Sequence, residues 1–181
     1  MTAGRARAAL HPALGALLVT MLIGGLAAVT GEPLLFPSLG PTAYLLLATP
    51  TQPAASPRNA FAGHLVGLLG GAAGLTAFGL WDLPADLGHL SWARAGASAL
   101  ALTITCGGMV WTGLPHPPAG ATTLIVALGV LHTPGQLLVI AVGVVLLTVV
   151  GGVFNRLAGV PYPLWRPPDI SFAQPPVADR T

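Results

Sequence analysis

The chain has 181 residues, of which 54% are hydrophobic and only 7% are charged. A soluble domain carries roughly 25% charged residues, so this composition excludes a water-facing globular protein and predicts an integral membrane protein. The seven arginines stand singly, without any lysine, and form no basic patch for nucleic acid. The single cysteine, Cys106, excludes both an internal disulfide and a thiolate metal cluster.

Four long apolar stretches predict membrane-spanning helices, because about 20 apolar residues in a helix cross a bilayer core of roughly 30 Å. These helices are expected at about 12–30, 58–80, 92–112 and 135–156. The first follows Arg5 and Arg7 and resembles a signal peptide. It is longer than the usual ~7–15-residue apolar core and lacks a clear cleavage motif, so we expect it to remain as a helix.

Two shorter apolar segments lie between the long ones. The first, FPSLGPTAYLLLATP, contains prolines near its start and at its end, and the second runs over 117–131. The second would cover only about 22 Å as a helix, so neither is expected to cross as a regular helix. The long–short–long order occurs twice, over about 12–80 and 92–158, with a polar linker at 81–91. We therefore predict one all-α polytopic membrane domain of about six segments in two pseudo-repeats, with a cytoplasmic tail at 159–181.

The short segments leave two topologies open. If they cross as partly unwound helices, the chain crosses six times and its halves are inverted; if they are re-entrant, it crosses four times and the halves are parallel. Six crossings place Arg58 on the cytoplasmic side and Asp82 and Asp86 outside, in agreement with the positive-inside rule. Both topologies keep the two termini inside. Abundant Ala, Gly and Arg without lysine indicate a bacterial plasma (inner) membrane.

The stretch LPHPPAGATT combines a histidine with three prolines before the second short helix. Proline disfavours helical geometry in the residue before it but suits a first helical turn. We expect a helix to begin here with free backbone amides at the positive end of its dipole, which is a site for an anion. The expected donors are the amides and hydroxyls of Ala119, Gly120, Ala121, Thr122 and Thr123.

The first half repeats this arrangement in SLGPTA, where Gly40 allows a turn and Pro41 begins the helix. Ser38 and Thr42 supply hydroxyl groups beside that turn. Paired segments interrupted by glycine and proline in two halves are typical of a transporter binding site near the membrane midplane. The alternative is that the prolines only start two short packing helices.

Three further residues are candidates for contact with an anion. His64 lies inside an apolar helix, where ionisable groups are functional candidates, although it could simply bond a neighbouring helix. Arg58 and Asn59 stand at the entrance to that helix and could attract an anion, although Arg58 could equally be a topology anchor.

His116 could donate to an anion, relay a proton or cap the helix. The remaining histidines, His11, His89 and His132, are expected at the membrane interfaces. A metal site formed by His64, His116 and Cys106 has no supporting spacing, so no metal or other cofactor is expected. Gly63, Gly67 and Gly71 predict close helix packing, either within the chain or in a homo-oligomer.

Three stretches in order, SLGPTAYLLLATP, SPRNAFAGHLVG and LPHPPAGATTLI, resemble the HPP family of integral membrane proteins. The family is named for the sequence found here at His116, Pro117 and Pro118. Members from cyanobacteria and plant plastids are implicated in nitrite transport, so the resemblance implies nitrite as the substrate. Many relatives are described as having four transmembrane helices. Where relatives often read Phe-Gly-Ala-Ser, this chain reads Leu39-Gly40-Pro41-Thr42 and keeps the hydroxyl.

The resulting hypothesis is a transporter or channel for a small inorganic anion, with nitrite as the expected substrate and the lipid bilayer as its environment. The alternative is a non-transporting membrane subunit that assembles with and regulates a partner. An enzyme is not expected, because the acidic residues fall outside the spans: Glu32, Asp82, Asp86, Asp169 and Asp179. Direct use of ATP is not expected either, because the sequence contains no P-loop motif.

Overall fold

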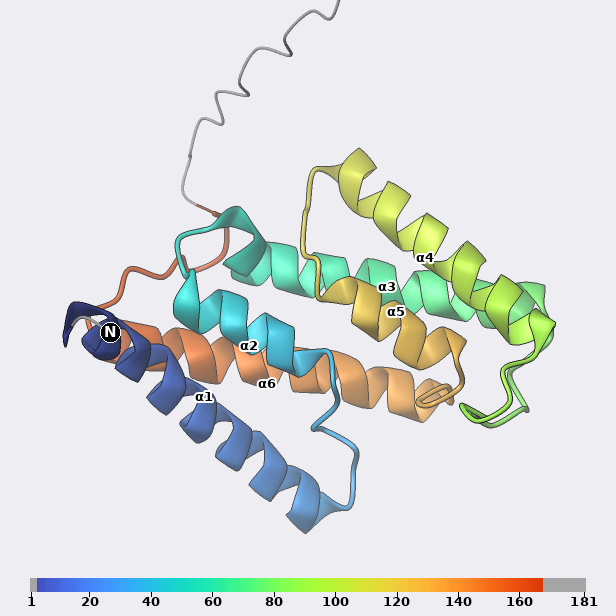
Figure 1. Ribbon diagram of the computed structural model, residues 1–181, viewed down its shortest axis with the longest axis horizontal. Helices are drawn as coiled ribbons and strands as arrows, with labels where there is room; N and C mark the ends of the chain where they lie inside the picture. Colours follow the sequence, from blue (N-terminus) through green and yellow to red (C-terminus); the bar gives the residue numbers. More distant parts are fainter. Residues whose placement is uncertain (1–2, 168–181) are drawn as a thin grey trace, which may run out of the picture.

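The computed structural model describes residues 3–167, which fold into helices joined by loops (Figure 1). The helices are α1 (Ala3–Thr30), α2 (Leu39–Ala48), α3 (Pro57–Ala77), α4 (Trp92–Thr112), α5 (Ala119–Ala127) and α6 (Pro134–Leu157), with a 3-10 turn η1 (Pro53–Ala55). Four segments are long and apolar enough to cross a membrane: Ala8–Thr30, Pro57–Ala77, Trp92–Thr112 and Pro134–Leu157. The predicted all-α polytopic class is confirmed. Most of the expected tail, residues 168–181, lies outside the described residues.

Two helix boundaries differ most from the prediction. Helix α1 begins at Ala3 and continues through Pro12. Helix α5 ends at Ala127, four residues earlier than expected, because Gly129 adopts a left-handed backbone with φ of 82°. The amides of Val130 and Leu131 both turn back to the carbonyl of Ile125, at 3.0 and 3.3 Å. The last carbonyls of a helix have no amide partner within the helix. The two bonds to Ile125 satisfy one of these carbonyls and so terminate α5.

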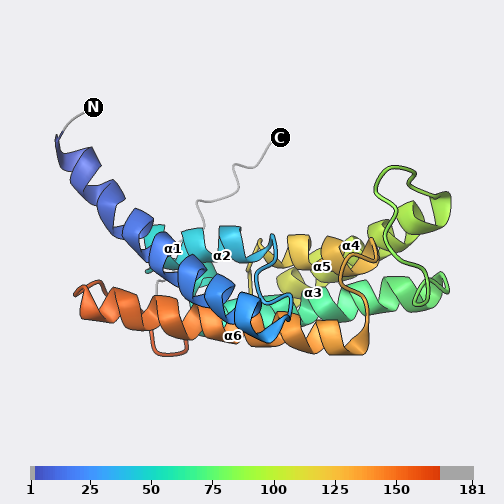
Figure 2. The ribbon, with the colours of Figure 1, turned by 90° about the horizontal axis from the view of Figure 1, so that it is seen from below.

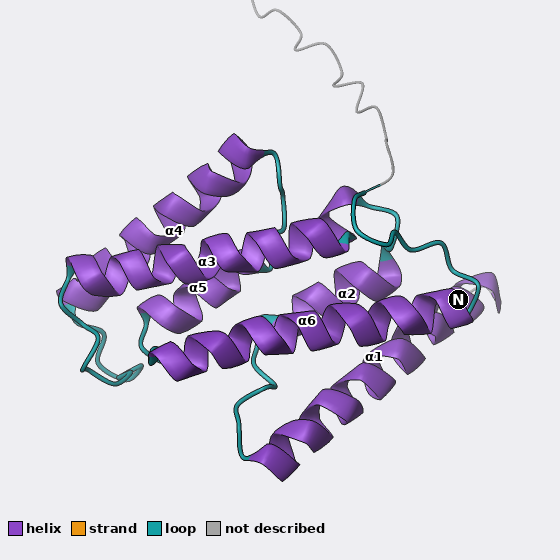
Figure 3. Ribbon diagram, turned by 180° about the vertical axis from the view of Figure 1, so that it is seen from behind, coloured by secondary structure: helices purple, strands orange, loops and turns teal. Residues whose placement is uncertain are grey.

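The six helices are interleaved across the two halves of the sequence. Helix α2 packs against α1 and α6, whereas α5 packs against α3 and α4. Helices α3 and α6 also contact each other and form one layer, seen edge-on in Figure 2 and from behind in Figure 3. Each short helix therefore packs against a long helix from the other half of the sequence.

The short helices begin in the middle of the molecule and run in opposite directions (Figure 1). An irregular segment precedes each short helix: residues 31–38 lead into α2, and residues 113–118 lead into α5. In each case the irregular segment forms the first part of the course through the bundle, and the short helix forms the second part. Successive helices alternate in direction from α1 to α6, so the loop at 49–56 and the linker at 78–91 lie towards opposite ends of α3 (Figure 1). This is the course that six crossings require. The orientation in the membrane stays a prediction.

Labelling of two introduced cysteines tests that orientation. We expect Gln52→Cys to react with a membrane-impermeant maleimide only from the cytoplasmic side, and Leu87→Cys only from outside. Both positions are exposed, and Cys106, which is exposed on α4, would first be replaced by serine. Intact cells and inverted vesicles provide the two sides. The reverse pattern at both positions would support four crossings.

The glycine face predicted on the third helix packs inside the chain. A Cβ atom at Gly67 would lie 2.7 Å from the carbonyl oxygen of Ala119, and one at Gly71 would lie 2.6 Å from the Cβ of Val126. The same atom at Gly63 would lie 2.5 Å from the Cβ of His116. The face therefore brings α3 against α5 and against the segment that precedes α5, which settles the alternative left open by the sequence.

Alanine substitutions at two helical glycines should have opposite effects on stability. At Gly74 the new Cβ would meet the carbonyl oxygen of Ala97 at 2.5 Å, and overpacking of this kind costs about 1–3 kcal/mol. At Gly107 no atom lies within 4 Å, so alanine should gain up to about 1 kcal/mol from helix propensity. Thermal unfolding in detergent should show a lower Tm for Gly74→Ala and an unchanged or higher Tm for Gly107→Ala. Equal values would contradict the packing described here.

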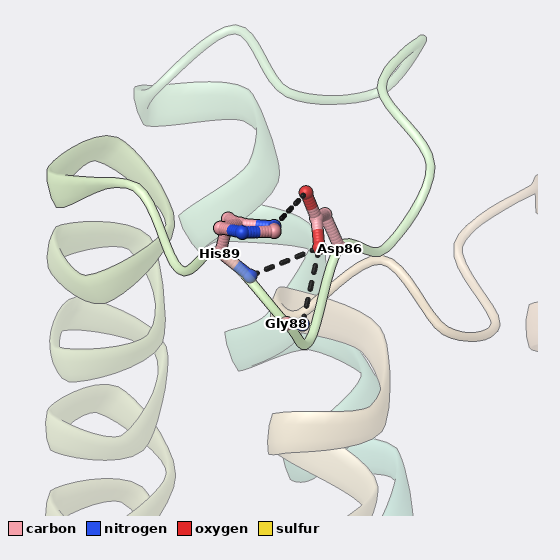
Figure 4. Close-up of polar contacts among 3 residues, drawn as sticks. All are labelled: Asp86, Gly88 and His89. Atoms are coloured by element: carbon pink, nitrogen blue, oxygen red, sulfur yellow. Dashed lines mark hydrogen bonds and ion pairs between the residues drawn. The ribbon is translucent and has the colours of Figure 1, made fainter.

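The linker between α3 and α4 contains a local turn around Asp86. The Oδ1 atom of Asp86 accepts from the amides of Gly88 and His89, both at 3.0 Å, and the Nδ1 atom of His89 lies 3.5 Å from Asp86 Oδ2 (Figure 4). His89 is exposed in this linker, and its predicted place at the membrane interface stays a prediction. These contacts fix the conformation of the turn without any contact to the centre of the bundle.

Arg94 holds the linker and the end of α5 together. It lies in the first turn of α4, and its side chain is buried. The guanidinium donates to four carbonyl oxygens, from Leu80, Leu83, Pro84 and Ala127. The planar group thus bonds the last turn of α5 and the first part of the linker at the same time.

Candidate functional site

Five polar side chains are buried together where α2 and α5 begin. They come from the start of α2, the middle of α3, the segment before α5 and the first turn of α5. Each is at most 1% exposed: Ser38, Thr42, His64, His116 and Thr122. In a bundle dominated by apolar residues, buried polar groups of this kind require hydrogen-bond partners.

The five side chains satisfy one another in a continuous hydrogen-bonded chain. The hydroxyl oxygens of Ser38 and Thr122 lie 2.7 Å apart, and the Thr122 oxygen lies 2.7 Å from Nδ1 of His64. The Nε2 atoms of His64 and His116 lie 3.2 Å apart, and their rings are tilted by 58°. The Thr42 hydroxyl lies 3.0 and 3.3 Å from these two nitrogens. The two short helices therefore meet through their side chains.

The bond to the carbonyl of Ala54 determines which ring nitrogens of the two histidines carry a hydrogen. The carbonyl can only accept, and it lies 2.7 Å from Nδ1 of His116, so this nitrogen carries a hydrogen. In the neutral ring Nε2 of His116 is then an acceptor, and Nε2–H of His64 donates to it. His64 Nδ1 accepts from Thr122, whose oxygen accepts from Ser38. Along the path from Ser38 through Thr122, His64 and His116 to Ala54 the donors therefore point in one direction. The Thr42 hydroxyl lies beside this path and donates to the carbonyl of Ser38 at 2.9 Å.

Helix α3 positions His116 from two sides. Gly63 lies beside its Cβ and provides the space for the ring. Asn59, one turn earlier, donates from Nδ2 to the carbonyl of Pro115 at 3.3 Å. Prolines flank the histidine and restrict its backbone, so the ring is held by the segment as well as by its bonds.

The expected free amides are not free. The amides of Ala119, Gly120 and Ala121 bond the carbonyls three residues earlier, at 3.0 to 3.1 Å. The amides of Leu39 and Gly40 do the same in α2, at 3.0 and 3.3 Å. Residues before each helix adopt turn geometry, so their carbonyls accept the amides that would otherwise face a ligand. The expectation of open amides at these two helix starts is therefore not met, and the donors without a backbone carbonyl three residues earlier belong to side chains.

The other predicted residues lie around the cluster or away from it. Ala119 and Thr123 are buried on the face of α5 that packs against α3. Gly120 and Ala121 are half-buried, and Gly120 faces Leu102 of α4. Gly40 is exposed, with open space beside its Cα. These two glycines therefore do not face the cluster.

Arg58 and Asn59 remain at the entrance to α3, as predicted. The side chain of Arg58 is half-buried, and its amide donates to the carbonyl of Trp165 at 3.0 Å. The Tyr162 hydroxyl donates to the carbonyl of Ala55 at 2.9 Å. The segment after α6 is thereby attached to the loop that bonds His116.

Thr105 and Asn155 are buried polar residues that were not predicted from the sequence. Thr105 of α4 bonds the Thr123 hydroxyl at 2.8 Å, one turn beyond the cluster. Asn155 of α6 donates to the carbonyl of Leu46 at 2.8 Å and accepts from Nε2 of His11 at 2.8 Å. Asn155 thus bonds the last turn of α2, as Arg94 bonds the last turn of α5. The only signal in the sequence is a polar residue within an apolar run. This signal does not distinguish the buried Thr105 from the exposed Thr103.

The arrangement does not assemble the three-residue metal set considered from the sequence. His64 and His116 are adjacent, but Cys106 is exposed on α4. Among residues 3–167, no three side chains of His, Cys, Asp or Glu come together in a way that could hold a metal ion. The chemistry of the cluster is that of hydroxyls and neutral imidazoles, which donate and accept hydrogen bonds.

Long apolar helices around two short, interrupted helices that meet at a buried polar cluster define a polytopic α-helical membrane protein. A family model described as the HPP transmembrane region matches residues 1–163, and the chain belongs to the HPP family. Neither the curated proteins nor the solved structures contain a match to this chain.

Proposed function

We propose that the chain is a transporter or channel for a small inorganic anion, with nitrite as the substrate and the buried polar cluster as the binding site. One observation carries the proposal: two interrupted helices begin at a fully buried, hydrogen-bonded set of side chains inside an apolar bundle. Interrupted helices of this kind mark the substrate sites of secondary transporters. The resemblance of the motifs to relatives implicated in nitrite transport supports the choice of anion.

The cluster suits a small planar anion. Its hydroxyls and ring N–H groups donate only to one another and to backbone carbonyls. Nitrite oxygens can replace those acceptors, because a hydroxyl needs only to rotate to donate to a new partner. Hydrogen bonds to a charged acceptor are stronger than neutral ones. Binding therefore exchanges bonds within the cluster for stronger bonds to the anion.

Access to the cluster requires movement, because all five side chains are buried. We assign this movement to the irregular segments 31–38 and 113–118, which contain few backbone hydrogen bonds and border the cluster. Arg58, half-buried at the entrance to α3, attracts the anion on one side. We place the protein in a bacterial inner membrane with both termini cytoplasmic, so that the halves are inverted and the two segments open towards opposite sides.

Reconstitution of the purified chain alone tests this function. Liposomes containing the protein should take up nitrite with saturable kinetics and faster than protein-free liposomes, which measure the passive permeation of nitrous acid. The competing function, a subunit that only regulates a partner, predicts no such difference. Rates equal to those of protein-free liposomes for nitrite, nitrate, formate and chloride would contradict the proposal. The main sequence feature in favour of the subunit, the glycine face, is already covered within the chain.

A further inference from the structure

We propose that the chain carries one proton with each anion, and that the His64–His116 pair is the proton site. The inference rests on the proposed function and extends it to the energy source of transport. It starts from the charges around the pair. Helix α2 supplies hydroxyls from Ser38 and Thr42, and α5 supplies Thr122. The turn η1 supplies a carbonyl from Ala54. The titratable groups that face the pair are therefore the two imidazoles themselves.

The charged side chains of the surrounding helices lie away from the pair. Arg58 precedes His64 by six residues on α3, which is roughly 9 Å along the helix axis. Arg94 bonds four carbonyls in the first turn of α4, and Arg156 lies in the last turn of α6. Helix α2 contains no charged residue. Transfer of an isolated anion into such surroundings costs at least several kcal/mol, so a counter-charge has to arrive with it.

The imidazole pair can supply that counter-charge. In the neutral pair one N–H lies between the two Nε2 atoms, which are 3.2 Å apart. A proton bound to Nε2 of His116 gives each ring an N–H directed at this point and leaves one buried positive charge. The oxygen of Thr42, 3.0 and 3.3 Å from the two nitrogens, shows that one oxygen atom can be reached from both rings. An anion oxygen in that position accepts both hydrogens, and the charges of +1 and −1 cancel.

Proton and anion therefore stabilise each other in the site, and either alone leaves an uncompensated charge in the membrane interior. Two further hydrogen bonds continue from the histidine pair: Nδ1 of His64 lies 2.7 Å from the Thr122 hydroxyl, which lies 2.7 Å from the Ser38 hydroxyl. Each hydroxyl can accept one proton while it passes on another, so this chain connects Nδ1 of His64 to the start of α2. The transported unit is one proton and one anion, with no net charge.

The experiment measures initial nitrite uptake by the unaltered chain in liposomes, with protein-free liposomes subtracted. A pH gradient and a potassium diffusion potential, set by valinomycin, are varied independently. We expect an inward proton gradient to raise the rate by up to about tenfold per pH unit, since one proton enters per cycle. An inside-positive potential should leave the rate unchanged. A rate that follows the potential and ignores the proton gradient would overturn proton coupling and leave anion transport standing, whereas no protein-dependent uptake would overturn the proposed function itself.

A matched pair of histidine variants locates the proton site. His116→Gln keeps a hydrogen-bonding side chain but cannot be protonated near neutral pH, so the acceleration by the proton gradient should disappear. His89→Gln alters an exposed linker residue and should retain the full acceleration. A folded His116→Gln protein with undiminished acceleration would contradict the assignment to the imidazole pair.

Discussion

Replacement of Thr122 by valine should lower protein-dependent nitrite uptake by at least about tenfold, which corresponds to roughly 1.4 kcal/mol. Valine has nearly the shape of threonine but lacks the hydroxyl that joins Ser38 to His64. The substitution leaves the Ser38 hydroxyl and Nδ1 of His64 without a hydrogen-bond partner inside the bundle, at a cost to stability of about 1–3 kcal/mol. We therefore expect a folded protein with a lower Tm whose transport is impaired.

Thr103→Val is the matched control for this substitution. Thr103 lies on the exposed face of α4, and its hydroxyl bonds only the carbonyl of Ala99 in its own helix. Its removal should change neither uptake nor stability appreciably, because surface substitutions usually change stability by no more than about 0.5 kcal/mol. Equal uptake by the two valine variants would show that the Thr122 hydroxyl has no part in transport.

Replacement of Arg94 by methionine should cause the largest loss of stability, about 3 kcal/mol. The variant loses the bonds from a charged group to four carbonyls, and a single hydrogen bond to a charged group contributes about 1.5–3 kcal/mol. The desolvation of the guanidinium offsets part of the sum. Thermal unfolding in detergent and the rate of proteolysis within residues 78–91 provide two independent measurements.

Two further variants separate charge from geometry at this position. Arg94→Lys keeps the charge but lacks the planar fork that reaches several carbonyls at once, so its Tm should fall between those of methionine and arginine. Arg156→Met removes an exposed arginine that bonds the carbonyls of Tyr162 and Pro163. It should have a much smaller effect. An unchanged Tm and unchanged proteolysis in Arg94→Met would show that these bonds do not stabilise the fold.

The sequence predicts the helices well because each helix depends on residues within its own segment. Apolar runs of membrane-spanning length define the long helices, and prolines with glycines interrupt the two short ones. The meeting of Ser38 with Thr122 follows from the repeated order of segments, which places both interruptions at similar depth. His64 is a candidate because ionisable groups inside an apolar helix are often functional, and His116 is a candidate because it lies among prolines directly before a short helix. Only the packing brings their Nε2 atoms to 3.2 Å.

Other features depend on three-dimensional packing. The sequence cannot show that the carbonyl of His116 accepts the amide of Ala119 in a turn, so the amides were expected to be free. Thr103 and Thr105 look alike in sequence, and only the direction of packing against α5 separates them. Arg94 lies near the linker in sequence, and its burial depends on the position of α5 beside it.

Nitrogen-15 NMR of the imidazoles tests the central claim most directly, because it observes the site rather than the flux. The protein labelled at its five histidines should show His116 with hydrogen on Nδ1 and His64 with hydrogen on Nε2. The variants His64→Gln and His116→Gln assign these signals. Titration with nitrite should then shift the nitrogens of His64 and His116 saturably and leave the exposed His89 unchanged. Saturable nitrite uptake in liposomes without any shift at these two rings would contradict the claim that the anion binds where the interrupted helices meet.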